Sequence, residues 1–127
     1  MENCIFCKII KGEIPCLKIY EDRDFLAFLD VKPINPGHTL LVPKKHDDYL
    51  FDLTDIHYAS VLLKAKDLAI LLKDKLNPKR VGLVVEGFGV AHVHVHLIPI
   101  NQANELNPEK AKLATMEELE VIAKKLS

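Results

Sequence analysis

Three histidines alternate with two valines between positions 92 and 96, in the run His-Val-His-Val-His. Because successive side chains of a β-strand point to opposite faces, His92, His94 and His96 share one face, and Val93 and Val95 share the other. A helix would distribute the imidazoles around its axis, so the spacing predicts a strand. The valine face is suited to a core. The histidine face is available for nucleophilic attack, proton donation or metal binding, although a solvated, histidine-rich strand would show the same pattern.

The rest of the chain predicts the elements that pack on this strand. Apolar residues at alternate steps of four and three predict a long amphipathic helix over residues 54–76, capped by Thr54 and ended at Asn77-Pro78. We therefore expect an α+β fold, a five-stranded and mostly antiparallel sheet with one long helix on one face. The expected strands are 17–20, 25–29, 39–42, 80–85 and 92–100, and the shorter helices are 6–11 and 116–126.

The composition excludes several classes of protein. A chain of 127 residues, 49% apolar and 28% charged, is typical of a single domain, here residues 1–127, with its own core. A net charge of −1 provides no basic surface for a nucleic-acid backbone, so no nucleic-acid partner is expected. Apolar runs are far too short to span a membrane, and no signal-peptide pattern is present. We expect a cytoplasmic protein with no membrane partner.

The three cysteines are an odd number and do not form a disulfide framework. Cys4 and Cys7 make a Cys-x-x-Cys motif, which in a reducing compartment indicates metal ligands or a redox couple. A redox couple normally follows a strand and begins a helix, and no strand is predicted before Cys4. Metal binding is therefore the preferred interpretation, with free thiols as the alternative. Cys16 stands alone and is interpreted as a small apolar residue.

Several segments resemble the histidine triad (HIT) superfamily of nucleotide hydrolases and transferases, and in particular its Hint-like branch with a zinc-binding Cys-x-x-Cys. The resemblance covers residues 4 to about 100, leaves 101–127 outside, and implies a five-stranded meander plus helix. It also implies a homodimer with a ten-stranded sheet, which would bring the C-terminal segment near the partner's nucleotide pocket. The matching segments, in family order, are Cys-Ile-Phe-Cys-Lys-Ile-Ile (4–10), Gly-Glu-Ile-Pro (12–15), Ala-Phe-Leu-Asp-Val (27–31), Pro-Gly-His-Thr-Leu-Leu-Val-Pro-Lys-Lys-His (36–46) and the triad with its Leu-Ile-Pro continuation.

The resemblance also implies roles for particular residues. His94 would be the nucleophile that attacks an α-phosphate and forms a nucleotidyl-histidine, and His96 would donate to a phosphate or leaving-group oxygen, unless it only orients the strand. Asp30 would accept from both ribose hydroxyls. A closed, structural Zn²⁺ site would use Cys4, Cys7, His46 and His92. The base would lie among Ile5, Phe6, Phe28 and Val31, for which ordinary core packing is the alternative.

One departure from the family pattern lies just before the triad. Relatives carry a glutamine and a serine or threonine where this chain has Phe88 and Gly89. The backbone N–H of Gly89 can still bind a phosphate, but the leaving-group preference is open. His38 is expected to be a buried hydrogen-bonding residue behind the site.

The leading hypothesis is a hydrolase of purine nucleotides, namely a nucleoside phosphoramidase that acts on AMP or GMP conjugates. The first alternative is a dinucleoside polyphosphate hydrolase, which would use the same His94 chemistry. The second is a zinc-stabilised nucleotide-binding adaptor with weak catalysis, which the missing glutamine and serine favour and the intact histidines oppose.

Overall fold

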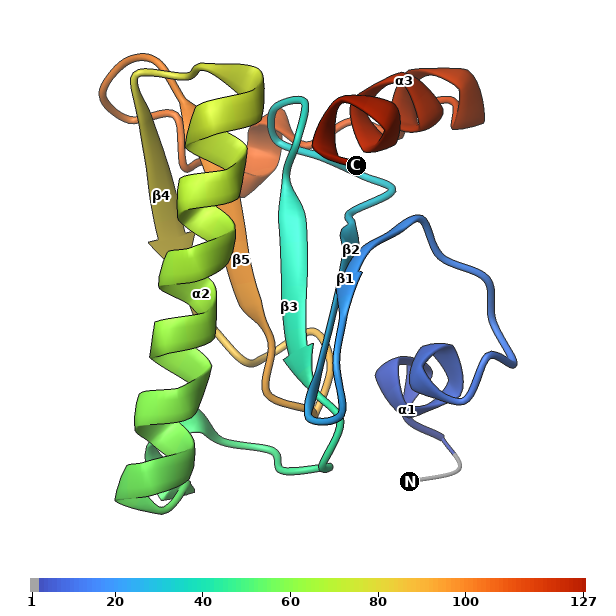
Figure 1. Cartoon of the computed structure of the whole chain (residues 1–127), viewed down its shortest axis with the longest axis vertical. Helices are drawn as coiled ribbons and strands as arrows, with labels where there is room; N and C mark the ends of the chain where they lie inside the picture. The colour runs from blue at the N-terminus through green and yellow to red at the C-terminus, as the bar shows by residue number, and fades with distance from the viewer. Residues whose placement is uncertain (1–2) are drawn as a thin grey trace.

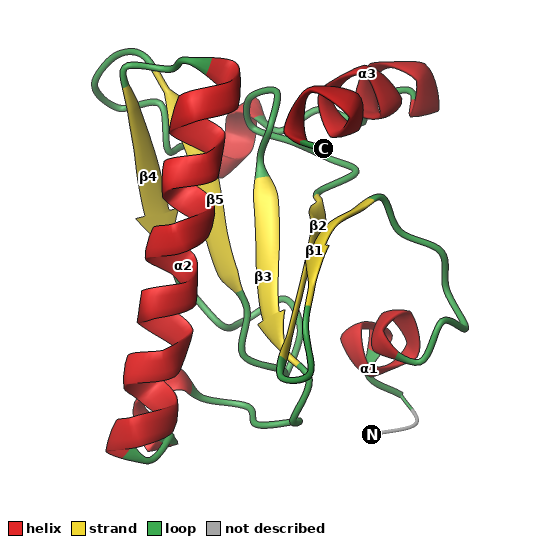
Figure 2. Cartoon of the chain, viewed as in Figure 1, coloured by secondary structure: helices red, strands yellow, loops and turns green. Residues whose placement is uncertain are grey.

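The computed structural model describes residues 3–127 and contains one antiparallel sheet with strand order β1-β2-β3-β5-β4. Figure 2 shows the strands of this sheet in yellow, behind and beside the long helix. The five-stranded antiparallel sheet with helices confirms the predicted fold class. The strands are β1 (Lys18–Glu21), β2 (Phe25–Leu29), β3 (Thr39–Pro43), β4 (Arg80–Val84) and β5 (Val95–Ile100).

Three helices surround the sheet: α1 (Ile5–Ile10), α2 (Asp55–Leu76) and α3 (Met116–Leu126). In Figure 1, α2 runs in front of the sheet, α1 lies beside β1 and β2, and α3 crosses the upper end. The predicted ends of α2 are confirmed: the Thr54 hydroxyl accepts from the His57 N–H, and Asn77 ends the helix at φ 53°. Within residues 3–127, no helix is long and apolar enough to cross a membrane. Two short 3₁₀ turns, Leu50–Asp52 and Pro108–Lys110, complete the chain.

The sheet is buried on both faces, and each face has its own core. Val93, Val95 and Leu97 pack in the core that α2 covers. Phe28 and Leu40 belong to a second core on the opposite face, together with Phe6 and Cys7 of α1. The alternation along residues 92–97 therefore sends valine and leucine toward α2 and histidine toward the α1 side, as the sequence predicts.

Strand β5 begins at Val95 and not at residue 92, so this predicted boundary is wrong. The last residue pair between β3 and β5 joins Leu41 to Val95, and continuing the ladder would put Val93 opposite Pro43. Proline has no N–H to donate, so the ladder stops there. The Val93 N–H donates instead to the backbone oxygen of Asp47, at 2.7 Å. His92 and His94 thus precede the regular strand.

The segment after β5 folds back over the sheet of its own chain. Leu106 packs on Gly82 of β4 so closely that a Cβ at Gly82 would lie 2.8 Å from Leu106 Cδ1. Further along, the Ala114 N–H donates to the Val31 carbonyl at 2.9 Å, which ties the segment to the β2–β3 connection. Leu106, Pro108 and Ala111 of this segment line a pocket together with His38 and His96 of the same chain.

We predict that Gly82→Ala lowers the free energy of unfolding by about 1 kcal/mol, because the added methyl group must push the end of the Leu106 side chain away from β4. Urea unfolding measures this change. Gly89→Ala is the control, since nothing lies within 4 Å of a Cβ at that position. Equal stability of the two variants would contradict the packing of Leu106 on β4.

Candidate functional site

Four metal-ligating side chains meet where α1, the end of β3 and the start of the triad come together. Their donor atoms all lie within 4.8 Å of one another. The Nδ1 atom of His92 is 3.5 Å from Cys4 Sγ, 3.6 Å from Cys7 Sγ and 3.1 Å from His46 Nδ1. Ligand atoms of a tetrahedral zinc site are about 3.3–3.8 Å apart, given Zn–S and Zn–N bonds of about 2.3 and 2.0 Å. The structure thus brings together all four predicted ligands, with the two His92–sulfur distances inside this range and the His92–His46 distance slightly below it.

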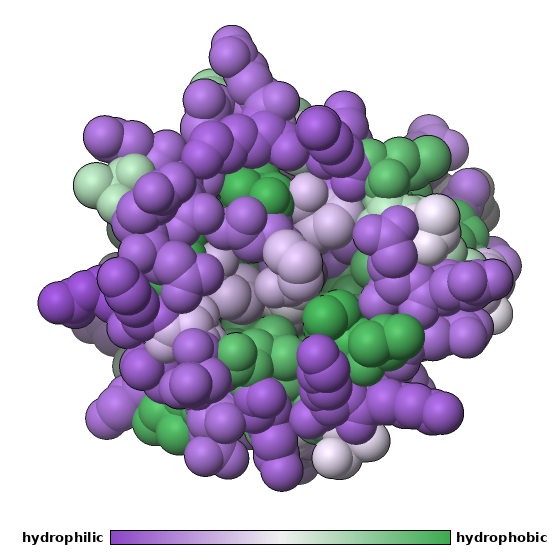
Figure 3. Space-filling view, turned by 90° about the horizontal axis from the view of Figure 1, so that it is seen from above, coloured by the Kyte–Doolittle hydropathy of each residue, from purple (hydrophilic) through white to green (hydrophobic). Residues whose placement is uncertain are grey.

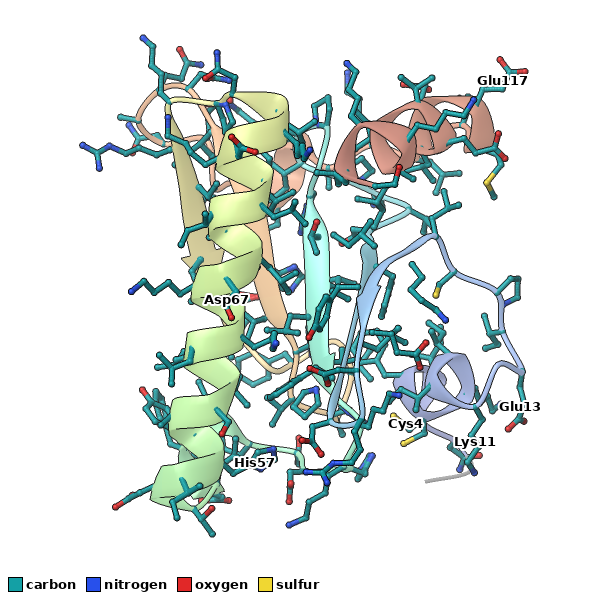
Figure 4. The ribbon with its side chains drawn as sticks, viewed as in Figure 1. Cys4, Lys11, Glu13, His57, Asp67 and Glu117 are labelled. Atoms are coloured by element: carbon teal, nitrogen blue, oxygen red, sulfur yellow. The ribbon has the colours of Figure 1, made fainter. Side chains whose placement is uncertain are left out.

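The hydrogen bonds around this cluster also suit a metal. His92 Nε2–H donates to the Pro43 carbonyl at 2.8 Å, which leaves the lone pair of Nδ1 directed at the sulfurs. Burial lowers the pKa of His92, which keeps the imidazole neutral. The Cys7 N–H donates to Cys4 Sγ at 3.4 Å, which orients this sulfur within the cluster. Figure 4 shows Cys4 at the foot of α1, far from His57 at the lower end of α2. The donor set leaves no ligand position for water, as in structural zinc sites.

His94 is held by a hydrogen bond from its own ring to the chain. Its Nδ1 lies 2.7 Å from the His92 carbonyl oxygen, which only accepts, so Nδ1 carries the proton and Nε2 keeps its lone pair. Phe6 and the His94 ring pack edge to face, with centroids 5.0 Å apart. The ring is 6% exposed and therefore has one restricted orientation. A neutral imidazole with a free lone pair is the tautomer that nucleophilic attack needs.

His96 has the opposite tautomer, because His38 determines it. The Ile34 N–H donates to His38 Nδ1 at 3.0 Å, so the His38 proton is on Nε2. His38 Nε2–H then donates to His96 Nδ1 at 2.9 Å, which leaves the His96 proton on its Nε2. Burial, with His38 and His94 nearby, lowers the pKa of His96 to about 4. The ring is therefore a neutral hydrogen-bond donor at pH 7.

Asp30 directly follows β2 and approaches the same nitrogen of His38 that contacts His96. One carboxylate oxygen is 3.5 Å from His38 Nε2, and the other accepts from the Lys32 N–H at 2.9 Å. Asp30, His38 and His96 also have donor atoms within 4.8 Å of one another. His38 Nε2 is protonated, however, and a protonated nitrogen has no lone pair for a metal. This second cluster is a hydrogen-bonded group and does not fit a metal ion.

A pocket of about 180 Å³ opens over Asp30, His38 and His96. Its remaining wall is mostly apolar and comes from β4, β5, the β2–β3 connection and the C-terminal segment. Lys32 and Glu86 add one charge of each sign. The other lining residues are Ile34, Val84, Ile98, Leu106, Pro108 and Ala111.

The predicted base-binding residues divide into two kinds. Phe6 and Phe28 are 6% and 4% exposed and pack edge to face in the core beneath the histidines. Ile5 and Val31 are 45% and 58% exposed and offer apolar surface to a ligand. Gly89 lies away from the pocket over His96, in a hollow next to Ile5, His46 and Cys4.

Two polar residues that sequence reasoning missed lie behind the pocket. Asn35 and Glu105 hydrogen-bond to each other at 2.9 Å and join the β2–β3 connection to the C-terminal segment. The Asn-Pro-Gly run at 35–37 indicates a turn. A glycine within a strand, such as Gly82, indicates that another segment of the backbone can pack closely on the strand. No feature of the sequence distinguished Glu105 from the exposed acidic residues near it.

The family model described as HIT domain matches residues 11–103. The chain is 42% identical over 106 residues to the adenosine 5'-monophosphoramidase of Candida albicans, covering 76% of this chain and 70% of the relative. The structure of this chain resembles that of a Hit-like protein from Bartonella henselae, with a TM-score of 0.88 and 34% identity, covering 99% of this chain and 95% of the other. A Zn-bound histidine triad family protein from Mycobacterium smegmatis gives a TM-score of 0.81 and 27% identity, covering 98% and 94%. The chain belongs to the HIT family.

We predict that the free energy of unfolding falls as the pH is lowered from 6.5 toward 4, in part because of His96. In this interval an unfolded histidine takes up a proton, whereas folded His96, with its pKa near 4, does not. Urea unfolding at pH 7 and pH 4.5 measures the loss. His96→Asn should lose less stability over this interval than the wild-type chain. An identical loss in both would contradict a lowered pKa at His96.

Proposed function

We propose that this HIT-family enzyme is a nucleoside phosphoramidase, which hydrolyses the P–N bond between the α-phosphate of a purine nucleotide and an amine. The observation that carries the proposal is the pair of opposite tautomers at His94 and His96. One ring has a free lone pair on Nε2 and the other has a proton on Nε2. The two rings lie side by side, with centroids 5.2 Å apart. Together they supply the nucleophile and the hydrogen-bond donor that transfer at phosphorus needs.

The nucleoside would lie between α1 and the end of β2. The carboxylate of Asp30 accepts from the two ribose hydroxyls, and the exposed side chains of Ile5 and Val31 contact the base. Phe6 and Phe28 support this surface from the core. Nothing lies within 4 Å of a Cβ placed at Gly89, so a phosphate oxygen has room to approach the backbone of this loop and accept from its N–H. The similarity to adenosine 5'-monophosphoramidases supports a purine nucleotide such as an AMP conjugate; a GMP conjugate is the other expected substrate.

The reaction then proceeds in two displacements. His94 Nε2 attacks the α-phosphorus, the P–N bond to the amine breaks, and the amine leaves with a proton from water. His96 Nε2–H donates a hydrogen bond to a non-bridging oxygen, where charge accumulates in the transition state. The His92 carbonyl stabilises the positive nucleotidyl-imidazolium through the His94 Nδ1–H. Water next attacks the phosphorus, a proton of this water passes to the solvent, the bond to His94 breaks, and AMP and neutral His94 are released.

The metal site and the assembly complete the proposal. Zn²⁺ bound by Cys4, Cys7, His46 and His92 would hold α1 against the catalytic segment as a structural ion. A homodimer with a ten-stranded sheet is supported by β4, which is an edge strand beside the exposed Leu63 and Ile70 of α2. Two thiolates kept as metal ligands fit a reducing cytoplasm.

We predict that His94→Ala lowers kcat for an adenosine phosphoramidate by at least about a thousand-fold, because the nucleophile is lost while the fold and AMP binding remain. Quenching the wild-type reaction in base should trap AMP on His94. His57→Ala is the control, since this histidine lies on the first turn of α2, outside the site. Comparable activity of His94→Ala would contradict the mechanism. Faster turnover of a diadenosine polyphosphate would favour the polyphosphate hydrolase, and AMP binding without turnover would favour the adaptor.

We predict about one zinc per chain in protein purified without chelators, and a lower melting temperature after its removal, because a closed site contributes folding energy. Elemental analysis and calorimetry measure both. Cys7→Ser should lose the metal and the stability that the metal provides, whereas Cys16→Ser should keep the metal because Cys16 is outside the cluster. Metal-free protein of unchanged stability would leave Cys4 and Cys7 as free thiols.

A further inference from the structure

Glu105 is a buried carboxylate at which the C-terminal segment turns. It is 9% exposed. One oxygen accepts the backbone N–H groups of Asn101 and Gln102, the latter at 2.9 Å, and the other accepts from Asn35 Nδ2. These hydrogen bonds lower the pKa of Glu105, so the group is ionised at neutral pH. An ionised group with little access to water depends on such partners, so the segment around it has one preferred conformation.

Asn35 extends this connection into the sheet and into the β2–β3 connection. Its Nδ2 group donates to the carbonyl of Pro99 in β5 at 2.9 Å as well as to Glu105. Its backbone carbonyl accepts the N–H of His38 at 3.1 Å. Asn35 therefore joins three parts of the chain: β5, the C-terminal segment, and the turn that carries His38.

The turn at residues 34–38 determines the tautomer of His96. The Ile34 N–H, one residue before Asn35, gives His38 its tautomer, and His38 gives His96 the opposite arrangement of lone pair and proton. A shift of the turn by a fraction of an ångström would weaken the bond to His38 Nδ1. His38 could then take the other tautomer, and the proton of His96 would no longer be restricted to Nε2.

We infer that Asn35 and Glu105 are positioning residues: by fixing the turn at residues 34–38, they keep the His96 proton on Nε2, where it faces the reacting phosphate. The C-terminal segment is thereby part of the catalytic arrangement of its own chain. The inference rests on the proposed function for its effect on rate, but its effect on the tautomer of His96 is independent of any substrate.

Glu105→Gln tests the inference, because the glutamine cannot accept at both ends. Its NH₂ group must face either Asn35 Nδ2 or the backbone N–H groups of Asn101 and Gln102, and both are donors. Nitrogen-15 NMR of the imidazoles, without substrate, reports the tautomers of His38 and His96. We expect single tautomers in the wild-type chain and mixed tautomers in Glu105→Gln. With an adenosine phosphoramidate, kcat should fall about ten-fold while KM changes less than about two-fold.

Glu109→Gln is the matched control, because it removes the same charge from an exposed position in the same segment. It should leave the tautomers and kcat unchanged. A Glu105→Gln protein that melts earlier but keeps both single tautomers and the wild-type kcat would overturn the inference, since its role would then be stability alone.

Two further measurements keep the inference testable if Glu105→Gln does not fold. Asn35→Ala removes the amide group that donates to both Glu105 and the Pro99 carbonyl. Mixed tautomers of His38 and His96 are expected in this variant as well. In the wild-type chain, a His38 proton on Nδ1 would overturn the inference without any variant. Mixed tautomers in Glu105→Gln, in a protein whose wild type hydrolyses no nucleotide, would support the positioning role and contradict only the proposed function.

Discussion

The arrangement of the site depends on His92, which is completely buried and bonded at three points. Its Nε2–H donates to the Pro43 carbonyl, its Nδ1 faces the two cysteine sulfurs, and its backbone oxygen accepts from His94. A buried imidazole with an unsatisfied nitrogen would cost about 1–3 kcal/mol, so each of these partners constrains the others. The Cys4–Cys7–His46–His92 cluster and His94 are thereby parts of one hydrogen-bonded unit.

The two catalytic candidates differ in the partner of their Nδ1 atoms. A carbonyl oxygen faces Nδ1 of His94 and holds a proton there, whereas an N–H of His38 faces Nδ1 of His96 and excludes one. Identical side chains two residues apart thus acquire opposite tautomers from the backbone and from one buried neighbour.

Figure 3 looks onto the end of the molecule that carries α3, where apolar and weakly polar surface lies within a hydrophilic rim. The β2–β3 connection that supports His38 is part of the wall at this end.

Much of the fold could be predicted because its causes are local in the sequence. The apolar period of residues 54–76 and the Thr54 cap predict α2 and its ends correctly. The alternation at 92–97 predicts correctly which side chains enter the core that α2 covers. The start of β5 could not be predicted from that strand alone, because it depends on which residue of β3 lies opposite. Proline at that position stops the ladder, and register between strands is a tertiary property.

The residue types of the site could be predicted, but not the network behind them. His94 and His96 stand out by spacing, and the four metal ligands are distinctive residues. Glu105 looks like any acidic residue of a polar segment until the chain folds back and buries it against Asn35. Its partner is 70 residues away in the sequence, so no short-range pattern could have identified the pair.

The central claim is that hydrolysis passes through a covalent bond to His94, and the stereochemistry at phosphorus tests it most directly. An adenosine phosphoramidate made chiral with sulfur at the α-phosphorus would be hydrolysed in water enriched in oxygen-18. Two successive in-line displacements, by His94 and then by water, each invert the phosphorus centre. The account predicts net retention of configuration. Net inversion would mean that water attacks the substrate directly and would contradict the covalent role of His94.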